Sequence, residues 1–590
     1  MSDKLPAKWA VGLADAFESQ LKVAKDDREL KRQTLRAERA QAELAAFKQS
    51  PWWRATGPLR RRAHRLKQNR RKSSPTNLNA ANMVAATRTV NSSTTPTAMT
   101  TALISRIRTV LIAFDGPTAD ADLELSEALD ALAALLDSHI EDRSLAWLTH
   151  IAVAARYPST EELQAFQTES VVAGPPAALA QLLADSSSRR PTVAQTAELE
   201  LVTDVVVDAT STSHRDAQTG IPRVVRECVP RWANRAPLRL IVWDPSGAFR
   251  PPTEHERWRI MDFVPREQSK LSAEIDHTIL VPWQTVVVVP EPTAQPGRSR
   301  ALACLGEYSG NDLAGIFYDA IYLSLPDTFP DEMRVRMPNY TPTFRACKRI
   351  STISHTVKGD LTGLLTAFSN AGFGGQRIHA HPLPVSADEV QPEDAEQNLQ
   401  RLDSVPGFPL VLSVGSFEPR KNQLMTIRAA ELLWREGMQF QLAFIGWDSW
   451  NAEITSREIE RARSNGRPVR IIRKADEGLL WTAYRAARFS MYISLVEGFG
   501  LPIAESLAVG TPVITSNYGA MAEVAAAGGA ITVDPRNLTQ VADAMRTLLT
   551  DDDAYAALRD AALARPQSNW DIYAAATWDW LVGGNEPTKA

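Results

Sequence analysis

The stretch VEGFGLPIAESLAVGTP, residues 496–512, decides the fold of the second half of this chain. The preceding MYISL, residues 491–495, has the short apolar character of a buried parallel strand. Gly498 and Gly500 leave the backbone free to turn and to approach a ligand, and Pro502 suits a first helical position. The stretch therefore predicts a strand, a glycine loop and a helix whose N-terminus offers N–H groups to an anion.

Two carboxylates frame this loop. Glu497 lies in the glycine-spaced part, and Glu505 lies about one turn inside the predicted helix. Carboxylate oxygens accept hydrogen bonds from hydroxyl groups, so the stretch could hold a phosphate at one end and sugar hydroxyls at the other. A nucleotide-sugar presents these two features. Taken alone, Glu505 is better explained as part of a solvated helix face.

Two cations follow an earlier strand of the same half. Residues 411–414 form an apolar run, and residues 422–433 carry apolar side chains at helical spacing, so Arg420 and Lys421 lie where a strand leads into a helix. Open α/β sheets bind ligands in the crevice beyond the carboxyl ends of their strands. An arginine fork and a lysine point charge there can stabilise a leaving diphosphate. Cations are disfavoured at a helix start, which makes a purely structural role less favourable.

The order of these motifs resembles retaining glycosyltransferase family 4, of GT-B fold. Residues 410–433 resemble the first strand, loop and helix of that family's nucleotide-binding domain, and residues 510–535 resemble its closing strand and turn. The resemblance implies an α/β chain with two Rossmann-like domains facing a cleft, preceded by a helical or coiled N-terminal extension. The segment Ser-x-x-Trp-Arg-x-Thr-x-Pro-Leu-Arg at residues 50–60 looks similar to segments of bacterial surface-polysaccharide and O-antigen glycosyltransferases.

The resemblance also implies a set of site residues. Glu505 is expected to hold the ribose hydroxyls and Glu497 to contact the donor sugar. The expected catalytic residues are Glu497, Arg420, Lys421 and Asp319. The expected donor-binding residues are Gly220, Arg420, Lys421, Glu497, Gly498, Phe499, Gly500, Leu501 and Glu505.

The first Rossmann-like domain is predicted to begin with a strand at residues 204–208, followed by Thr-Gly-Ile-Pro-Arg at residues 219–223. This segment resembles the loop through which the N-terminal domain touches the donor diphosphate. Gly220 would permit a close approach, and the helix from Pro222 would direct its N-terminus at the cleft. Arg223 is either a diphosphate ligand or part of a solvated helix face.

A further strand is predicted at residues 315–321, and Asp319 lies near its end. This residue occupies the place of a family aspartate that commonly follows a histidine. Here the preceding residue is Tyr318. Asp319 is a candidate to orient an acceptor hydroxyl, and a cap or turn role is the alternative. His355, in a segment that resembles the family's serine loop, either faces the cleft or has a structural role.

The N-terminal extension combines a long helical pattern with a basic segment. Trp52 and Trp53 precede a dense run of Arg and Lys up to residue 72. Tryptophans beside cations suit an anionic membrane surface, and a solvated basic linker is an equally good interpretation. Nucleic acid is a weaker alternative because no nucleic-acid fold accompanies the patch. The helix could also support self-association as a short coiled coil.

The sequence divides into six predicted regions. Two stretches have the composition of flexible linkers: residues 73–100, which are rich in Ser, Thr, Asn and Ala, and residues 185–195. A tryptophan-rich helix at residues 569–582 is suited to cross back onto the first domain. The predicted regions are an extension at 1–72, a linker at 73–100, a helical region with its linker at 101–195, the acceptor domain at 196–400, the donor domain at 401–568, and the crossing helix and tail at 569–590.

Composition limits the partners, the cellular compartment and the metal sites that can be expected. The 590 residues include 65 basic and 69 acidic ones, so no global charge favours nucleic acid. The sequence has three scattered cysteines, and it shows neither the apolar core of a signal peptide nor an apolar run of membrane-spanning length. We therefore expect a cytoplasmic protein that can make peripheral contact with the inner face of the membrane. There is no His-Glu-x-x-His motif, the Asp-x-Asp at residues 120–122 is remote from the donor motifs, and residues 551–553 suit a helix cap. No metal and no cofactor besides the donor is expected.

The predicted function is a retaining hexosyltransferase, mannosyl- or rhamnosyltransferase-like, that moves a sugar from a nucleotide donor to a glycan. The basic segment favours a lipid-linked acceptor in bacterial cell-surface polysaccharide synthesis. A phosphorylase or sugar-phosphate synthase of the same fold, and a non-catalytic scaffold, are the alternatives. The nucleotide, the sugar and the linkage stay open.

Overall fold

The computed structural model describes most of the chain after residue 94. By its contacts the chain divides into two compact units, Met1–Thr100 and Thr101–Ala590. The predicted N-terminal helix, the basic tryptophan segment and residues 73–94 of the first linker lie outside the described residues. The linker prediction is wrong for residues 95–100, which begin a helix. The described ranges are 95–116, 123–188, 192–216, 220–264, 271–334, 336–369, 374–385, 392–566 and 568–584.

A small helical region comes first, as predicted. Asp142 and Ser159 cap two of its helices by accepting hydrogen bonds from backbone N–H groups one turn ahead. The predicted linker at residues 185–195 is partly wrong, because residues 185–188 continue a helix and residues 193–196 form a 3-10 turn. The elements are α6 (Thr95–Ala113), α7 (Leu125–Ser138), α8 (Arg143–Ala154), α9 (Thr160–Val172), α10 (Pro175–Ser188) and η1 (Val193–Thr196).

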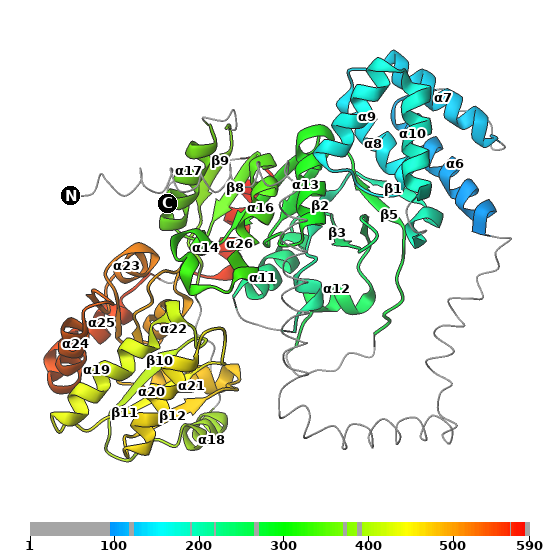
Figure 1. Ribbon diagram of the computed structural model, residues 1–590. Helices are drawn as coiled ribbons and strands as arrows, with labels where there is room; N and C mark the ends of the chain where they lie inside the picture. The colour runs from blue at the N-terminus through cyan, green and yellow to red at the C-terminus, as the bar shows by residue number, and fades with distance from the viewer. Residues whose placement is uncertain are drawn as a thin grey trace, which may run out of the picture. The chain divides into compact units, whose positions relative to one another are not determined.

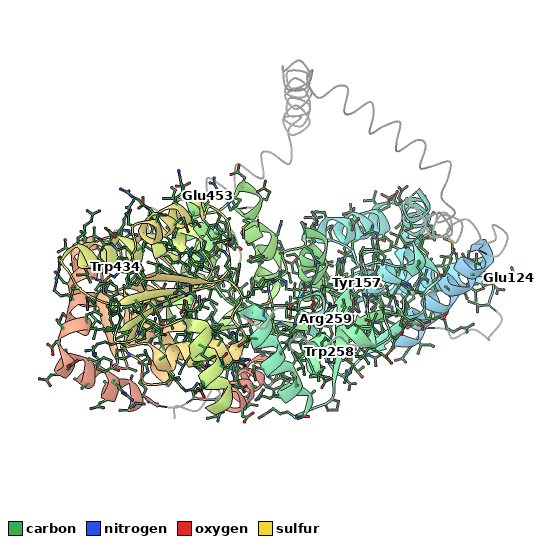
Figure 2. All side chains as sticks on the ribbon, turned by 90° about the horizontal axis from the view of Figure 1, so that it is seen from below. Glu124, Tyr157, Trp258, Arg259, Trp434 and Glu453 are labelled. Atoms are coloured by element: carbon green, nitrogen blue, oxygen red, sulfur yellow. The ribbon has the colours of Figure 1, made fainter. Side chains whose placement is uncertain are left out.

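Tyr157 joins this helical region to the sheet that follows (Figure 2). Its ring meets Trp147 and Phe249 edge-on, with centroids 5.8 and 5.1 Å away. Its hydroxyl donates to the Leu280 carbonyl oxygen at 2.5 Å. Edge-to-face aromatic pairs add about 0.5–1.5 kcal/mol to the burial of their apolar area, so the helical region is packed on the first domain rather than tethered to it.

In the described residues the first domain holds a seven-stranded sheet of order β4-β3-β2-β6-β7-β8-β9 (Figure 1). All neighbours are parallel except β3 and β4, and a separate parallel pair joins β1 to β5. The strands are β1 (Leu199–Val202), β2 (Val205–Asp208), β3 (Leu238–Trp243), β4 (Phe249–Arg250), β5 (Ile279–Pro282), β6 (Val286–Val289), β7 (Asp312–Phe317), β8 (Arg349–Thr352) and β9 (Arg377–Ala380).

Helices connect these parallel strands, as a right-handed crossover requires. Helix α11 begins beside Gly220, so the predicted helix from Pro222 is confirmed. The helical elements are η2 (Thr212–His214), α11 (Ile221–Ala233), α12 (Glu254–Met261), α13 (Pro296–Tyr308), α14 (Ile321–Ser324), η3 (Pro326–Thr328), α15 (Asp331–Arg334), α16 (Arg336–Ala346) and α17 (His355–Ser369).

The second domain holds a six-stranded, all-parallel sheet of order β12-β11-β10-β13-β14-β15 within the described residues. Its two faces are both buried: Val411 packs into one apolar cluster and Leu412 into another, as alternation along a strand dictates. The strands are β10 (Leu410–Val414), β11 (Gln441–Ile445), β12 (Val469–Ile472), β13 (Phe489–Tyr492), β14 (Val513–Ser516) and β15 (Ala530–Val533).

The helices of the second domain cover both faces of this sheet (Figure 1). They are α18 (Pro392–Leu402), η4 (Pro419–Lys421), α19 (Gln423–Arg435), α20 (Glu453–Ser464), α21 (Glu477–Ala486), α22 (Leu501–Ala508), α23 (Gly519–Ala525), α24 (Leu538–Thr550) and α25 (Asp552–Leu563), followed by the terminal helix α26 (Trp570–Leu581).

Two predicted strands lie a few residues too late in the sequence. β7 ends at Phe317 rather than continuing to residue 321, and β13 ends at Tyr492 rather than at residue 495. The apolar runs extend past the strands because the loops that leave a buried sheet edge are themselves buried. Pairing with the neighbouring strands, and not the length of the apolar run, sets where each strand ends.

Helix α18 spans the predicted domain boundary at residue 400. Asn398 donates to the Thr482 hydroxyl oxygen at 3.4 Å, and Arg401 pairs with Asp476 at 2.9 Å, so this helix packs on α21 of the second domain. The chain therefore passes between the two domains before Pro392.

The terminal helix α26 crosses back to the first domain, as predicted. The indole N–H of Trp232 in α11 donates to the Ala574 carbonyl oxygen at 2.8 Å, and Trp580 donates to the Ile350 carbonyl oxygen of β8 at 3.0 Å. Two parallel sheets, each between layers of helices, with a last helix returning to the first domain, make the predicted GT-B fold. Every helix in the described ranges is too short or too polar to span a bilayer.

Candidate active site

A buried ion cluster lies at the carboxyl ends of β10 and β13. Arg420 and Lys421 come from η4, directly after β10, and Glu497 comes from the loop after β13. Lys421 Nζ lies 2.6 Å from Glu497 Oε1, and an Arg420 guanidinium nitrogen lies 2.7 Å from Glu497 Oε2. The three side chains are 8–16% exposed. The structure therefore brings together three predicted catalytic residues that lie 77 positions apart in sequence.

Two residues that the sequence did not single out complete this cluster. The Tyr492 hydroxyl donates to Glu497 Oε1 at 2.8 Å, and Lys421 donates to the same hydroxyl at 2.5 Å. Glu418, which is buried, pairs with Arg420 at 2.8 Å. Tyr492 and Glu418 each lie within five residues of a predicted catalytic residue. In the sequence, only their side-chain type could have indicated a role in the site. With Glu418 and Glu497, the cluster carries two negative and two positive charges.

The backbone of the η4 loop is held in place by the strands around it. The Leu495 N–H donates to the Arg420 carbonyl oxygen at 2.7 Å. Asn422 adopts a left-handed conformation, φ 57°, and its side-chain amide donates to the Ile493 and Pro535 carbonyl oxygens at 3.2 and 2.8 Å. Asparagine tolerates this conformation better than most residues. The loop is thus preorganised to present its two cations.

Electrostatics in the cluster keep Glu497 ionised. Burial raises the pKa of this carboxyl, but Arg420 and Lys421 outweigh burial and hold the pKa at about 2, below the ordinary 4.5. Burial lowers the pKa of Lys421, although Glu497 opposes the shift. Burial also opposes the charge on Arg420, but Glu497 and Glu418 raise its pKa above the ordinary value. At neutral pH the cluster holds charges whose mutual attraction replaces their hydration.

The glycine loop after β13 touches the first domain at Gly498. A Cβ atom on Gly498 would lie 2.4 Å from the Tyr318 carbonyl oxygen and 3.2 Å from Asp319 Cβ. The Ser354 hydroxyl donates to the Gly498 carbonyl oxygen at 2.7 Å. Only glycine fits here, because the backbone approaches the first domain at this point. That Gly498 also permits a close approach to a ligand stays a prediction.

Asp319 lies at this junction, half-buried. Its carboxylate accepts from the Ile321 N–H at 3.2 Å, which is the turn role that the sequence left open. Burial raises the pKa of Asp319, Arg420 counteracts this, and Glu497 adds to it. The aspartate thus feels the charges of the ion cluster in addition to closing its own turn.

The rest of the glycine loop shapes the start of α22. Gly500 has φ 107°, a conformation that side chains rarely adopt, and Leu501 begins the helix. Phe499 is buried and lines a cavity of about 340 Å³ together with His355 and Glu523. The side chain of Phe499 thus serves packing, and any donor contact at this position falls to its backbone.

Glu505 is buried on α22, so it is not part of a solvated helix face. The Tyr484 hydroxyl donates to Glu505 Oε2 at 2.9 Å, and an Arg223 guanidinium nitrogen lies 3.4 Å from Oε1. Arg223 belongs to α11 of the first domain, and its side chain is only 12% exposed. The sequence did not predict this contact between domains, because its two partners are 282 residues apart.

Gly220 stands at the start of α11 with φ 64°, and among the described residues no atom lies within 4 Å of where its Cβ would be. Residues 217–219, which complete the predicted diphosphate loop, lie outside the described residues.

His355 is exposed at the start of α17. The Glu523 carboxylate of α23 accepts from the His355 and Thr356 N–H groups at 2.8 Å each. A glutamate from the second domain thus caps a helix of the first, and the favourable helix dipole strengthens the contact. Of the two roles predicted for His355, the structure shows the structural one, through the backbone N–H of this residue.

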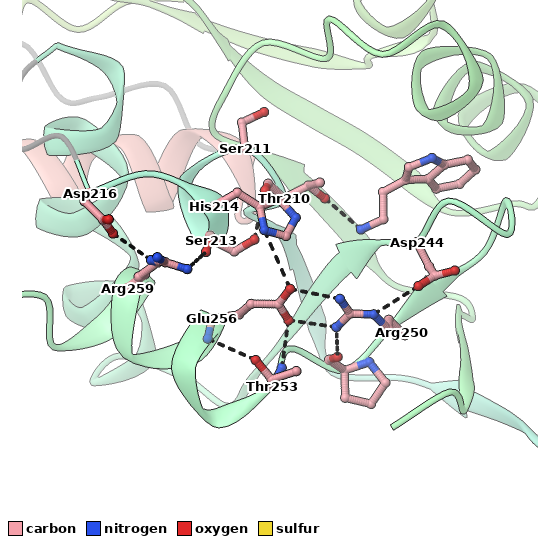
Figure 3. Close-up of polar contacts among 12 residues, drawn as sticks. Thr210, Ser211, Ser213, His214, Asp216, Asp244, Arg250, Thr253, Glu256 and Arg259 are labelled. Atoms are coloured by element: carbon pink, nitrogen blue, oxygen red, sulfur yellow. Dashed lines mark hydrogen bonds and ion pairs between the residues drawn. The ribbon is translucent and has the colours of Figure 1, made fainter. Parts of the chain in front are cut away.

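A polar network supports the loops beyond β2 and β3 in the first domain (Figure 3). Arg250 and Glu256 form a bidentate pair at 2.7 and 2.8 Å, and Glu256 also accepts from the Thr253 N–H. His214, at the end of η2, lies 3.7 Å from Glu256. Bidentate pairs are geometrically specific, so the Arg250–Glu256 pair fixes the orientation of α12 against β4. Sequence spacing gave no signal for it.

Beneath this network, Arg298 is fully buried between Asp208 at 2.7 Å and Glu291 at 3.1 Å. Glu291 also accepts from the Thr212 N–H and hydroxyl at 2.8 and 2.7 Å. Two carboxylates and the loop donors satisfy the arginine, which is what allows its charge to be buried. These bonds hold Ser211 and Thr212, in the described part of the loop after β2, in place.

An aromatic contact also joins the two domains. Trp450, in the loop after β11, packs on Phe329 with ring centroids 5.3 Å apart, and Asn451 donates to the Thr328 carbonyl oxygen at 3.4 Å. Trp447 in the same loop is 54% exposed. Its carbonyl oxygen accepts from the Phe417 N–H at 2.9 Å, which ties this loop to the one that carries the cations.

In the described parts of the chain, no group of three or more His, Cys, Asp or Glu side chains is placed to hold a metal ion. The Asp-x-Asp at residues 120–122 lies outside these parts. Asp551 caps α25 by accepting from the Ala554 N–H at 2.9 Å, which confirms the predicted cap. That the site works without a metal stays a prediction.

Comparison with known proteins gives this geometry a family. Residues 394–565 match the family described as glycosyl transferases group 1. O-antigen chain mannosyltransferase B of Escherichia coli is 29% identical over 241 residues, covering 40% of this chain and 61% of the relative. The serotype-specific mannosyltransferase WbdA of Escherichia coli is 22% identical over 338 residues, covering 54% of this chain and 40% of the relative. The chain thus spans less than two thirds of each of these relatives.

Two solved structures overlap much of the chain. WaaG, a glycosyltransferase involved in lipopolysaccharide biosynthesis, is 16% identical with a TM-score of 0.44 and covers 64% of this chain and 100% of its own. Anabaena HepE in complex with UDP and glucose is 14% identical with a TM-score of 0.46, covering 64% and 99%. At such scores the overlaps add nothing to the strand orders above. By its own strand orders this chain has the GT-B fold, and its residues 394–565 form a domain of the glycosyl transferases group 1 family.

Proposed function

We propose that this protein is a retaining glycosyltransferase that moves a hexose from a nucleotide-sugar to a glycan. The observation that carries the proposal is the ion cluster of Arg420, Lys421 and Glu497 at the carboxyl ends of β10 and β13. It holds two cations in a dry, fixed geometry, inside the part of the chain that matches group 1 glycosyl transferases.

The cations suit a leaving group that gains negative charge. In the reaction the bond between the sugar's anomeric carbon and the diphosphate oxygen breaks, and Arg420 and Lys421 stabilise the charge that develops on the diphosphate. Preorganised charges in a low-dielectric site stabilise a transition state more than mobile water does. Their present partner, Glu497, is placed to accept hydrogen bonds from the donor sugar's hydroxyls once the diphosphate shares the cations.

The acceptor side belongs to the first domain. Asp319 lies next to the glycine loop and is the candidate to orient the acceptor hydroxyl. The acceptor oxygen bonds to the anomeric carbon on the face that the diphosphate leaves, and its proton passes to a diphosphate oxygen. This front-face route retains the configuration of the sugar and needs no protein nucleophile.

The names of the relatives support the sugar and the acceptor. Two relatives are mannosyltransferases, one of them of the O-antigen chain. We therefore propose a mannosyl or related hexosyl donor and a cell-surface glycan acceptor, with a lipid-linked glycan as the preferred form.

A panel of nucleotide-sugars tests the proposal. We expect one donor, GDP-, UDP- or dTDP-linked, to raise the melting temperature of the protein and to be hydrolysed slowly to the nucleoside diphosphate. With that donor and an oligosaccharide acceptor, NMR should show a product anomer of the donor's configuration. An inverted product would refute retention, and a protein that no nucleotide-sugar stabilises would be a scaffold. Transfer to inorganic phosphate or a sugar phosphate alone would favour a phosphorylase or synthase.

A further inference from the structure

Arg223 reaches from one domain into the donor site of the other. It lies in the first turn of α11, and its guanidinium is 3.4 Å from Glu505 Oε1 on α22. The two side chains are 12% and 9% exposed, so the pair is largely shielded from water. From sequence alone Arg223 was either a diphosphate ligand or a surface residue. The structure places it on the carboxylate that is expected to hold the ribose.

The contact occupies an oxygen that a ribose hydroxyl needs. Glu505 Oε2 already accepts from the Tyr484 hydroxyl at 2.9 Å, and Tyr484 is fully buried. The Arg223 contact is longer, at 3.4 Å, where hydrogen bonds are weak. Of these two partners, Arg223 is the one that an arriving hydroxyl would displace.

A displaced Arg223 has another place to bind. It belongs to a helix N-terminus, where the dipole disfavours a cation and favours an anion. Among the described residues, no atom lies within 4 Å of where a Cβ on Gly220, beside that terminus, would be. A nucleotide whose ribose lies on Glu505 and whose diphosphate lies on Arg420 and Lys421 would pass through the reach of the Arg223 side chain. A guanidinium binds phosphate oxygens with a planar fork of donors.

We propose that Arg223 exchanges partners when the donor binds: it releases Glu505 to the ribose hydroxyls and binds the diphosphate. This inference rests on the proposed function. The exchange makes an arginine of the first domain sense the nucleotide on the second, so the two domains are held together by the substrate instead of by the chain alone.

The test compares nucleosides with their diphosphates. Binding of uridine, guanosine and thymidine, and of UDP, GDP and dTDP, is measured by NMR titration and calorimetry for the wild type and for R223Q. Removing Arg223 removes a competitor for Glu505, so the nucleoside should bind about threefold tighter, as expected for the loss of a weak ion pair. The diphosphate should bind about tenfold more weakly, the size of one lost charge-assisted hydrogen bond.

Two further variants separate the exchange from a structural effect. R223K keeps the charge without the fork and should fall between wild type and R223Q. R235Q is the matched control, because Arg235 lies just past the C-terminal end of the same helix and pairs with Asp579 of α26 at 2.9 Å. It should leave both affinities unchanged. If the R223Q variant is poorly folded, R223K carries the test.

The outcomes are distinct. Opposite changes for nucleoside and diphosphate in the Arg223 variants support the exchange. Equal weakening of both ligands would mean that the pair only holds the domains, and unchanged affinities would mean that Arg223 has no part in binding; either result overturns the inference while leaving the proposed function standing. A wild type that binds none of the three diphosphates overturns both.

Discussion

Replacing Glu497 with glutamine removes one charge from the ion cluster and keeps its shape. Lys421 and Arg420 would then face a neutral amide at 2.6 and 2.7 Å. Leaving a buried charge without its partner costs about 3–5 kcal/mol. The carboxyl's pKa gives an independent figure: its lowering from 4.5 to about 2 corresponds to about 3 kcal/mol of folding stability at neutral pH. We therefore expect E497Q to lose about 3 kcal/mol of unfolding free energy.

The same reasoning fixes the pH dependence. Because the folded pKa of Glu497 lies below its unfolded value, the stabilisation is fully present above about pH 4.5 and is lost as the pH falls toward 2. The stability difference between wild type and E497Q should therefore be constant from pH 7 to pH 5 and shrink below that. Urea unfolding followed by circular dichroism at each pH measures it.

Nucleotide binding should change in the opposite direction. In E497Q both cations lose the charge of Glu497 while Arg420 still pairs with Glu418, so the cluster carries an excess positive charge that a diphosphate can balance. We expect a nucleoside diphosphate to raise the melting temperature of E497Q more than that of the wild type, while sugar transfer falls. E453Q, at an exposed glutamate of α20 (Figure 2), is the matched control. An E497Q variant within about 0.5 kcal/mol of wild type, and no more responsive to nucleotide, would refute this account of the cluster.

Three further changes probe other parts of the site. Glu505→Ala should weaken nucleotide binding itself, whereas Glu497→Ala should chiefly lower turnover, by roughly 10²-fold; equal nucleotide affinity in wild type and Glu505→Ala would show the ribose assignment to be wrong. Gly498→Ala would place a Cβ atom 2.4 Å from the Tyr318 carbonyl oxygen, so activity should fall sharply. Gly363→Ala, at an exposed glycine of α17 with nothing within 4 Å of the added Cβ, should leave activity intact, and normal turnover in Gly498→Ala would contradict the close approach. Removing the residues before 95 should preserve activity on a soluble acceptor and reduce binding to anionic liposomes in a salt-sensitive way; undiminished liposome binding would exclude the basic segment as an anchor.

Much of the donor side was predictable because its signals are local. The strand, glycine loop and helix around Glu497 occupy fewer than thirty consecutive residues, and Arg420 and Lys421 follow a strand directly. Such motifs depend on backbone conformation within one turn or loop, which residue type strongly restricts. The terminal helix was predictable for the same reason, since its apolar and tryptophan pattern is written in one short segment.

Strand ends were less predictable, because apolar runs continue into buried loops. β13 stops at Tyr492, and the following residues leave the sheet while staying buried, so hydrophobicity alone placed the strand too late. The predicted domain boundary at residue 400 cut through α18. The helix belongs to the second domain because it packs on α21 there. Pairing and packing of this kind involve residues that the local pattern does not contain.

By itself the sequence determined the type of each domain and the chemical groups at the donor site, because these follow from short-range patterns and from side-chain chemistry. Only the tertiary structure decided which groups meet. It placed Lys421 against Glu497, seated Gly498 against the Tyr318 carbonyl, and joined Arg223 to Glu505 across 282 residues. Contacts between distant residues are selected by the packing of whole sheets and helices, where one buried charge requires a partner from wherever the fold can supply it.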